Sequence, residues 1–186
     1  MKSVCTAAAF AAALVMASAG YAQANTSTDF FQLAGNGTPQ QVQAALNNGA
    51  DVNAPDKDGK TPLMAAAFNP NSEVIVTLLK AGANINAQQK DGGTALMYAA
   101  VSNPPEVIAT LLKAGANINA QDNDGGTPLI WAAAFNQNPD VILMLLRAGA
   151  DPKAKTKEGQ TALDLAQSNA KLKASDAYRQ LQAASQ

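Results

Sequence analysis

The stretch Thr61-Pro62-Leu63-Met64-Ala65-Ala66 opens a pattern that the chain repeats three more times. The copies begin at Thr94, Thr127 and Thr161, in steps of 33, 33 and 34 residues. A second motif, Leu-Leu followed by a base and then Ala-Gly-Ala, recurs with the same period from Leu78, Leu111 and Leu145. Two independent motifs that share one period indicate a stack of similar structural units.

The first motif predicts the start of a short helix. The hydroxyl of Thr61 can accept from a free N–H of the first turn, and Pro62 has a backbone angle that suits the next position. Ala residues behind them leave a narrow apolar stripe that allows helices to approach closely. Asn69-Pro70 then ends this helix, because a residue before proline is pushed out of the helical region.

The second motif predicts the end of a second helix in each unit. An acid begins that helix at Glu73, Glu106 or Asp140, where it interacts favourably with the helix dipole. Apolar residues follow at helical spacing in residues 74–79, 107–112 and 141–146. The glycine that follows stops the helix in the left-handed conformation, at Gly82, Gly115 and Gly149. An extended loop with a glycine turn leads to the next unit.

These motifs resemble the ankyrin-repeat family, whose repeat has about 33 residues and a T-P-L-H-x-A signature. The resemblance implies an all-α solenoid of helix–turn–helix units joined by extended loops. The signature His is replaced by Met64, Met97, Ile130 and Asp164. In the family that His supports hydrogen bonds between neighbouring loops. Without it, the sequence does not establish whether this network forms.

The period divides the chain as follows. We expect a cleaved signal peptide over residues 1–24 and a single repeat domain over 25–186. That domain comprises an N-terminal cap repeat at 29–53, repeats at 58–90, 91–123 and 124–157, and a C-terminal capping repeat at 158–185. The extra residue of the third repeat falls near 136–138, between its two helices. A closing helix is expected over 177–184, with Tyr178 and Leu181 facing inward and Arg179 outward.

The first 24 residues have the features of an export signal. Lys2 precedes an apolar run over residues 4–19, and Ala22-Gln23-Ala24 follows as a small-x-small cleavage site. This predicts a periplasmic or secreted protein that begins at Asn25 and has no membrane-inserted segment. The alternatives are a buried N-terminal helix or an uncleaved anchor.

The composition excludes several kinds of chemistry. The chain has no His, which removes His-based acid–base catalysis and His-ligated metals. Its one Cys, Cys5, lies in the predicted signal peptide. With a net charge of −1 and few aromatic residues, nucleic-acid binding is not expected. We therefore predict no catalytic residue, no cofactor and no metal, and we expect a monomer.

Acidic residues cluster in the loops, at Asp56, Asp58, Asp91, Asp122 and Asp124. Calcium ligands or paired catalytic carboxylates are one interpretation. The favoured one is structural, because Asp beside Gly is typical of tight turns. Three alternating lysines over residues 153–157 are either a patch for an acidic partner or a solvated edge.

Aromatic residues share one phase of the repeat. Tyr98 and Trp131 hold equivalent positions on the first helix of their units, with Phe68 and Phe135 nearby. In the family this helix and the loop tips line the concave side. We therefore predict a protein-binding face with Phe68, Tyr98, Trp131 and Phe135 at its centre. Its predicted polar rim comprises Lys57, Lys60, Gln89, Lys90, Asp122, Asn123, Lys157 and Gln160. The alternative is that these rings fill gaps between helices.

Two classes of function remain, a binding module and an enzyme that uses only carboxylates. The resemblance favours a non-catalytic protein–protein interaction scaffold. Exported proteins of this kind are linked to support of catalase, which implies an accessory factor in oxidant protection. An immunity or antitoxin-type inhibitor and a secreted effector for a host protein are the alternatives. The identity of the protein partner does not follow from the residues.

Overall fold

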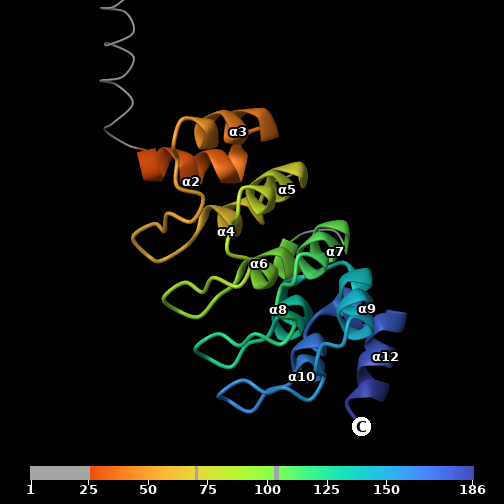
Figure 1. Ribbon diagram of the computed structural model, residues 1–186. Coiled ribbons are helices and arrows are strands. Elements are labelled where there is room, and N and C mark those ends of the chain that lie inside the picture. The colour runs from red at the N-terminus through yellow and green to blue at the C-terminus, as the bar shows by residue number, and fades with distance from the viewer. Residues whose placement is uncertain (1–25, 70, 103–104) are drawn as a thin grey trace, which may run out of the picture.

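The computed structural model describes residues 26–186 except for residues 70, 103 and 104. In these residues the chain forms helices and no strand (Figure 1). The helices are α2 (Thr26–Asn36), α3 (Pro39–Asn47), α4 (Pro62–Ala66), α5 (Glu73–Lys80), α6 (Ala95–Ser102), α7 (Pro105–Lys113), α8 (Pro128–Phe135), α9 (Pro139–Arg147), α10 (Ala162–Ala166), α11 (Ala170–Lys173) and α12 (Asp176–Ala184).

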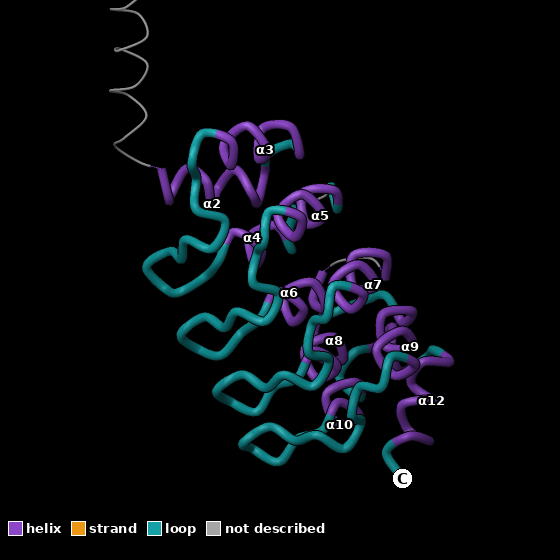
Figure 2. Tube along the Cα trace, viewed as in Figure 1, coloured by secondary structure: helices purple, strands orange, loops and turns teal. Residues whose placement is uncertain are grey.

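Pairs of antiparallel helices stack into a solenoid, as the sequence predicts. Helices α2, α4, α6, α8 and α10 contact one another in series, and we refer to them as the inner helices. The outer helices are α3, α5, α7, α9 and α12. Figure 2 shows that the loops between units project from the same side of the stack. The predicted all-α repeat architecture is therefore confirmed.

The predicted helix starts are confirmed by their caps. The hydroxyls of Thr61, Thr127 and Thr161 each accept a hydrogen bond from the backbone N–H three residues on. Thr38 forms a capping box with Gln41 at the start of α3. Because each cap satisfies an N–H that the helix leaves free, even the five-residue helices α4 and α10 begin at a defined residue.

The predicted helix ends are confirmed by the backbone. Gly82, Gly115 and Gly149 have φ values of 90°, 90° and 92°, in the left-handed region that disfavours other residues. The chain then turns sharply away from each outer helix toward the loop. Near-identical turns at these positions keep successive loops in the same orientation.

Apolar residues from both helix rows form one continuous core. In α7, Val107, Ile108 and Leu111 are buried. From the apolar stripe predicted over residues 107–112, we expect both Leu111 and Leu112 in the core, and this is wrong for Leu112, which is only half-buried. Leu112 instead lines an open groove between α7 and α9. A period of 3.6 residues places only one of two consecutive leucines directly against the next unit.

Asparagine side chains link neighbouring loops of the solenoid. The side-chain amide of Asn53 donates to the carbonyl of Gly82, and its oxygen accepts from the N–H of Asn84 at 2.7 Å. Asn86 and Asn119 make the same pair of bonds to the units that follow them. Hydrogen bonds between neighbouring loops are therefore present in a chain without His.

The two ends of the solenoid are closed by dedicated helices. At the N-terminal end Phe30 is buried, while Phe31 and Leu33 pack partly buried against the core. At the C-terminal end Leu181 of α12 is buried, Tyr178 is half-buried and Arg179 is exposed, as predicted. The sequence did not predict α11, a single turn capped by Asn169. The predicted signal peptide lies outside the described residues.

Among the described residues, no helix is both long enough and apolar enough to cross a membrane.

We predict that Leu111→Ala lowers the free energy of unfolding by about 2–5 kcal/mol, because Leu111 is completely buried between units. The half-buried Leu112 is the matched control, and Leu112→Ala should cost clearly less. Urea titration of both variants measures the difference. Equal losses would contradict the inferred packing.

A second prediction concerns acid stability. The N–H and hydroxyl of Thr161 donate to the Asp164 carboxylate at 2.9 and 2.7 Å, and these hydrogen bonds lower the pKa of Asp164. A carboxyl whose pKa is lowered by folding stabilises the fold above its unfolded pKa of about 3.9 and loses this effect as pH falls through the folded pKa. The stability advantage over Asp164→Asn should therefore shrink below about pH 4. Urea titrations at a series of pH values measure it, and an advantage that stays constant down to about pH 2 would refute the cap's contribution.

Candidate functional site

Three aromatic rings lie in contact across three units. Phe68 directly follows the C-terminal turn of α4, Tyr98 lies on α6 and Trp131 on α8. The ring centroids of Phe68 and Tyr98 are 5.4 Å apart, and those of Tyr98 and Trp131 are 5.7 Å apart in an edge-to-face arrangement. These distances are typical of favourable aromatic pairs. We call these three residues the aromatic row.

The exposure of the rings differs along the row. Phe68 is 54% exposed, whereas Tyr98 and Trp131 are half-buried and Tyr98 packs against the core. Burial raises the pKa of Tyr98, a hydrogen bond from Gln89 opposes this shift, and Asp91 and Asp56 add to it. The phenol therefore stays neutral at physiological pH and can donate a hydrogen bond.

Trp131, the single tryptophan of the chain, is held by the loop that precedes its helix. Its indole N–H donates to the Asp122 carboxylate at 2.7 Å. The other oxygen of Asp122 accepts from the N–H groups of Asp124 and Gly126. A side chain at Gly126 would collide with this arrangement, because a Cβ there would lie 2.7 Å from the indole nitrogen. The ring is thus fixed in position.

The predicted loop-tip residues divide into two groups. Lys57, Lys90, Asn123, Lys157 and Gln160 are exposed at the projecting loops, whereas Lys60, Gln89 and Asp122 are half-buried at the base. The tips are connected in series. The ammonium of Lys90 donates to the carbonyl of Lys57, and the side chain of Asn123 donates to the carbonyl of Lys90. The rim is therefore an ordered surface.

The acidic residues of the loops form the predicted turns. Asp56 accepts hydrogen bonds from the N–H groups of Asp58 and Lys60 at 2.8 Å each. Asp122 has the same role in its own turn, two repeats further along the chain. These bonds confirm the structural interpretation of both residues. Within the part of the chain that the structure describes, no group of three or more acidic, Cys or His side chains could hold a metal ion.

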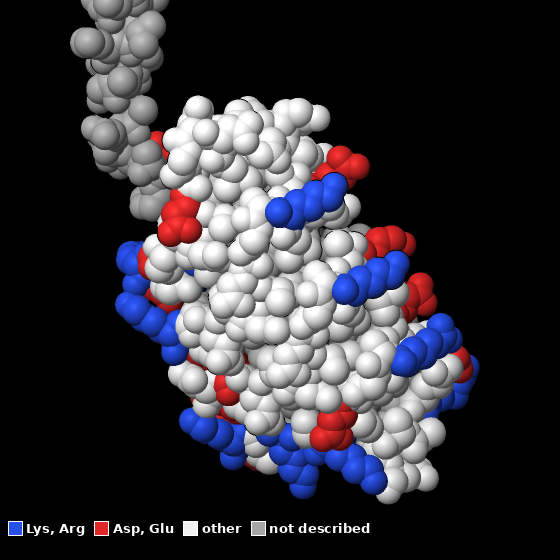
Figure 3. Space-filling view, viewed as in Figure 1, with Lys and Arg blue, Asp and Glu red and all other residues white. Residues whose placement is uncertain are grey.

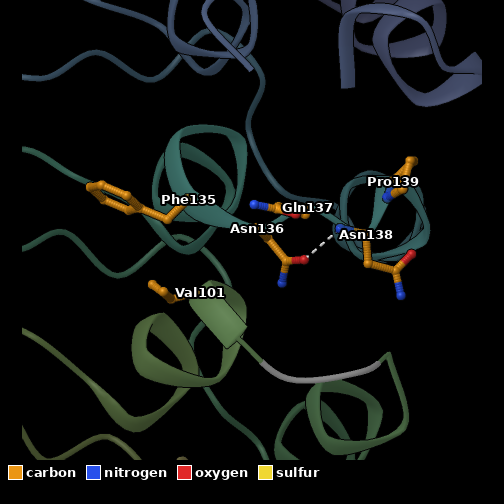
Figure 4. A pocket seen from close by; sticks show the side chains of 6 residues that line it. All are labelled: Val101, Phe135, Asn136, Gln137, Asn138 and Pro139. Carbon is orange, nitrogen blue, oxygen red and sulfur yellow. Dashed lines mark hydrogen bonds between the residues drawn. The ribbon is translucent and has the colours of Figure 1, made fainter. Parts of the chain in front are cut away.

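Phe135 lies apart from the aromatic row. It is 63% exposed at the end of α8 and borders an open hollow of about 590 Å³ with Val101, Asn136, Gln137, Asn138 and Pro139. Figure 4 shows the ring directed away from the turn that joins α8 to α9. In that turn Asn136 accepts a hydrogen bond from the N–H of Asn138. Among the described residues, ring contacts therefore join Phe68, Tyr98 and Trp131, while Phe135 borders the hollow beside the turn between α8 and α9.

Charged side chains are unevenly distributed over the surface. On the face shown in Figure 3, basic residues lie along the edge that carries the loop tips, around the C-terminal end and along the opposite edge, where acidic residues lie beside them. A largely uncharged area separates the charged edges on that face.

Comparison with protein families agrees with this architecture. Residues 30–122 match the model for ankyrin repeats (3 copies), and residues 111–166 match that for ankyrin repeats (many copies). A search of curated proteins gave no significant match. Ankyrin repeats generally serve as non-catalytic modules that bind other proteins. Since the first match alone spans half of the sequence, this chain belongs to the ankyrin-repeat family.

Proposed function

We propose that this protein is a non-catalytic scaffold that binds a partner protein through the aromatic row and the exposed loop tips. The observation that carries the proposal is the continuous contact of Phe68, Tyr98 and Trp131 across three units. Tyr and Trp are enriched at the centres of protein interfaces, where they bury a large area.

The support around the rings favours binding over a purely structural role. The Trp131 ring is held by Asp122, so little conformational entropy is lost when a partner covers it. More than half of the Phe68 surface is exposed to water, at a position where a polar side chain would be better solvated. The linked loop tips add an ordered polar rim of the kind that surrounds a binding hot spot.

We further propose that the protein acts outside the cytoplasm as an accessory factor that supports a partner enzyme under oxidising conditions. Residues 25–186 contain no Cys. Two of their three methionines, Met64 and Met97, are completely or almost completely buried. A chain with few accessible sulfur atoms offers few targets to oxidants. If the partner purified from the native host is an enzyme, its activity is measured with and without this protein. Higher activity in its presence indicates an accessory factor, and lower activity indicates an inhibitor.

We predict that the protein isolated from its native host begins at Asn25. Intact-mass measurement tests this, because the signal sequence should be removed after Ala24. A mature protein that still carries Met1 and Lys2 would refute the proposed export by cleavage.

We predict that Tyr98→Ala combined with Trp131→Ala weakens partner binding by at least about 2 kcal/mol, or about 30-fold in Kd. The partner is first captured from the native host by affinity purification and identified by mass spectrometry, and binding is then measured by calorimetry. Lys113→Ala is the control, because Lys113 is exposed at the end of the outer helix α7.

Circular dichroism and urea titration must accompany this measurement. The proposal requires a folded double variant with weakened binding and a Lys113→Ala variant that binds normally. A folded double variant that binds as tightly as the wild type would rule out the aromatic row as the binding face. Unfolding of the double variant would instead assign the two rings to the core.

A further inference from the structure

The aromatic row ends at a small cavity between the N-terminal cap and the first two repeats. This cavity has a volume of about 280 Å³, and its apolar lining includes Phe31 of α2, Met64 of α4, Phe68 and Tyr98. It is slightly smaller than typical ligand pockets, so it suits one large side chain better than a whole cofactor.

Two small residues account for the hollow. Ala65 holds the position that Tyr98 and Trp131 hold in the next two units, so no ring extends from α4 at this point. Gly35 of α2 faces it, and a Cβ at Gly35 would lie 3.8 Å from the Cβ of Ala65. The space that an aromatic ring fills in the following units is therefore open to solvent beside Ala65.

The cavity has one charged group in its lining, Lys60. The Lys60 ammonium lies 5.8 Å from the centre of the Tyr98 ring, and Lys60 as a residue is half-buried. Among the described residues the one ion pair is Arg179–Asp176, and no hydrogen bond engages the Lys60 side chain. The neighbouring Asp56 accepts from two backbone N–H groups of its own turn. A cation in the lining of an apolar cavity, without a carboxylate partner, favours an anionic ligand.

We infer that this cavity is the anchor point for a segment of the partner protein that carries an apolar side chain next to a carboxylate. The apolar side chain fills the space beside Ala65 and Met64, and the carboxylate pairs with Lys60. The segment then continues over Tyr98 toward Trp131. This inference rests on the proposed function, because it assigns partner chemistry to the same face.

Charge complementarity makes the requirement for the carboxylate testable. Asp56 and Asp91 both act electrostatically on Tyr98, and Lys60 is the one cation in the lining of the cavity. Without the Lys60 charge, no positive group in the lining offsets these two carboxylates. An anionic segment should then be repelled, while a neutral segment of the same shape is hardly affected.

Two peptides with blocked ends serve as probes, acetyl-Gly-Leu-Glu-Gly-amide and its analogue with Gln in place of Glu. Binding to the ¹⁵N-labelled protein is followed by NMR. The Glu peptide should shift the amide signals of Lys60, Phe68 and Tyr98, and should bind about tenfold more tightly than the Gln peptide. In Lys60→Gln this preference should disappear. Lys80→Gln is the matched control, because it removes one positive charge from an exposed position on α5.

The inference is overturned if neither peptide binds, if both bind wild type equally, or if Lys60→Gln keeps the preference for the Glu peptide. Partner capture with the same variants separates it from the proposed function. A partner that is lost in the Tyr98/Trp131 double variant but kept by Lys60→Gln supports the binding face and refutes the anchor. If the Glu peptide binds selectively at Lys60 but the partner binds the Tyr98/Trp131 double variant as tightly as the wild type, the anchor is supported and the binding face is refuted.

Discussion

Each unit of this solenoid buries its apolar face only against the unit beside it. Leu63, Leu96 and Leu129 of the inner helices are almost completely buried, yet each lies on a helix of five to eight residues. A helix of that length is not stable alone in water. Its stability comes from the neighbouring unit, so the structure is a chain of nearest-neighbour interfaces. The cap residues Phe30 and Leu181 end this chain by covering its two terminal faces.

Hydrogen bonds by amide side chains fix the spacing that this burial requires. On the loop side, Asn53, Asn86 and Asn119 each bridge to the following unit. Between the helices, the buried Asn69 and Asn136 donate to backbone carbonyls of the preceding unit. Hydrophobic burial alone would allow neighbouring units to slide, because it has no direction. The amide bonds remove that freedom, and aligned rings in successive units are a consequence.

The sequence predicts the backbone better than it predicts the surface. Caps such as Thr61 and stops such as Gly82 depend on local chemistry, which a single residue specifies. The half-burial of Leu112 follows from its place on α7, one residue beyond the buried Leu111, and Phe135 borders the hollow beside the turn between α8 and α9. A repeat period gives the phase of each residue and carries no information about how deeply its side chain is buried. The sequence does not predict the cavity beside Ala65. Part of its lining comes from α2, whose unit lacks the repeat motifs, so the other units do not indicate which residues α2 contacts.

The aromatic row combines a fixed end with an adaptable end. Trp131 is held by Asp122 and by the close approach of Gly126, whereas Phe68 has most of its surface in water and borders an open cavity. Tyr98 contacts both rings, so it connects the two environments. A rigid ring lowers the entropic cost of binding, and an open cavity discriminates by the size and charge of what enters it. In the binding face that we propose, affinity and selectivity thus arise at different units. A repeat protein can change one of them by substitution within one unit, because each unit contacts only its neighbours.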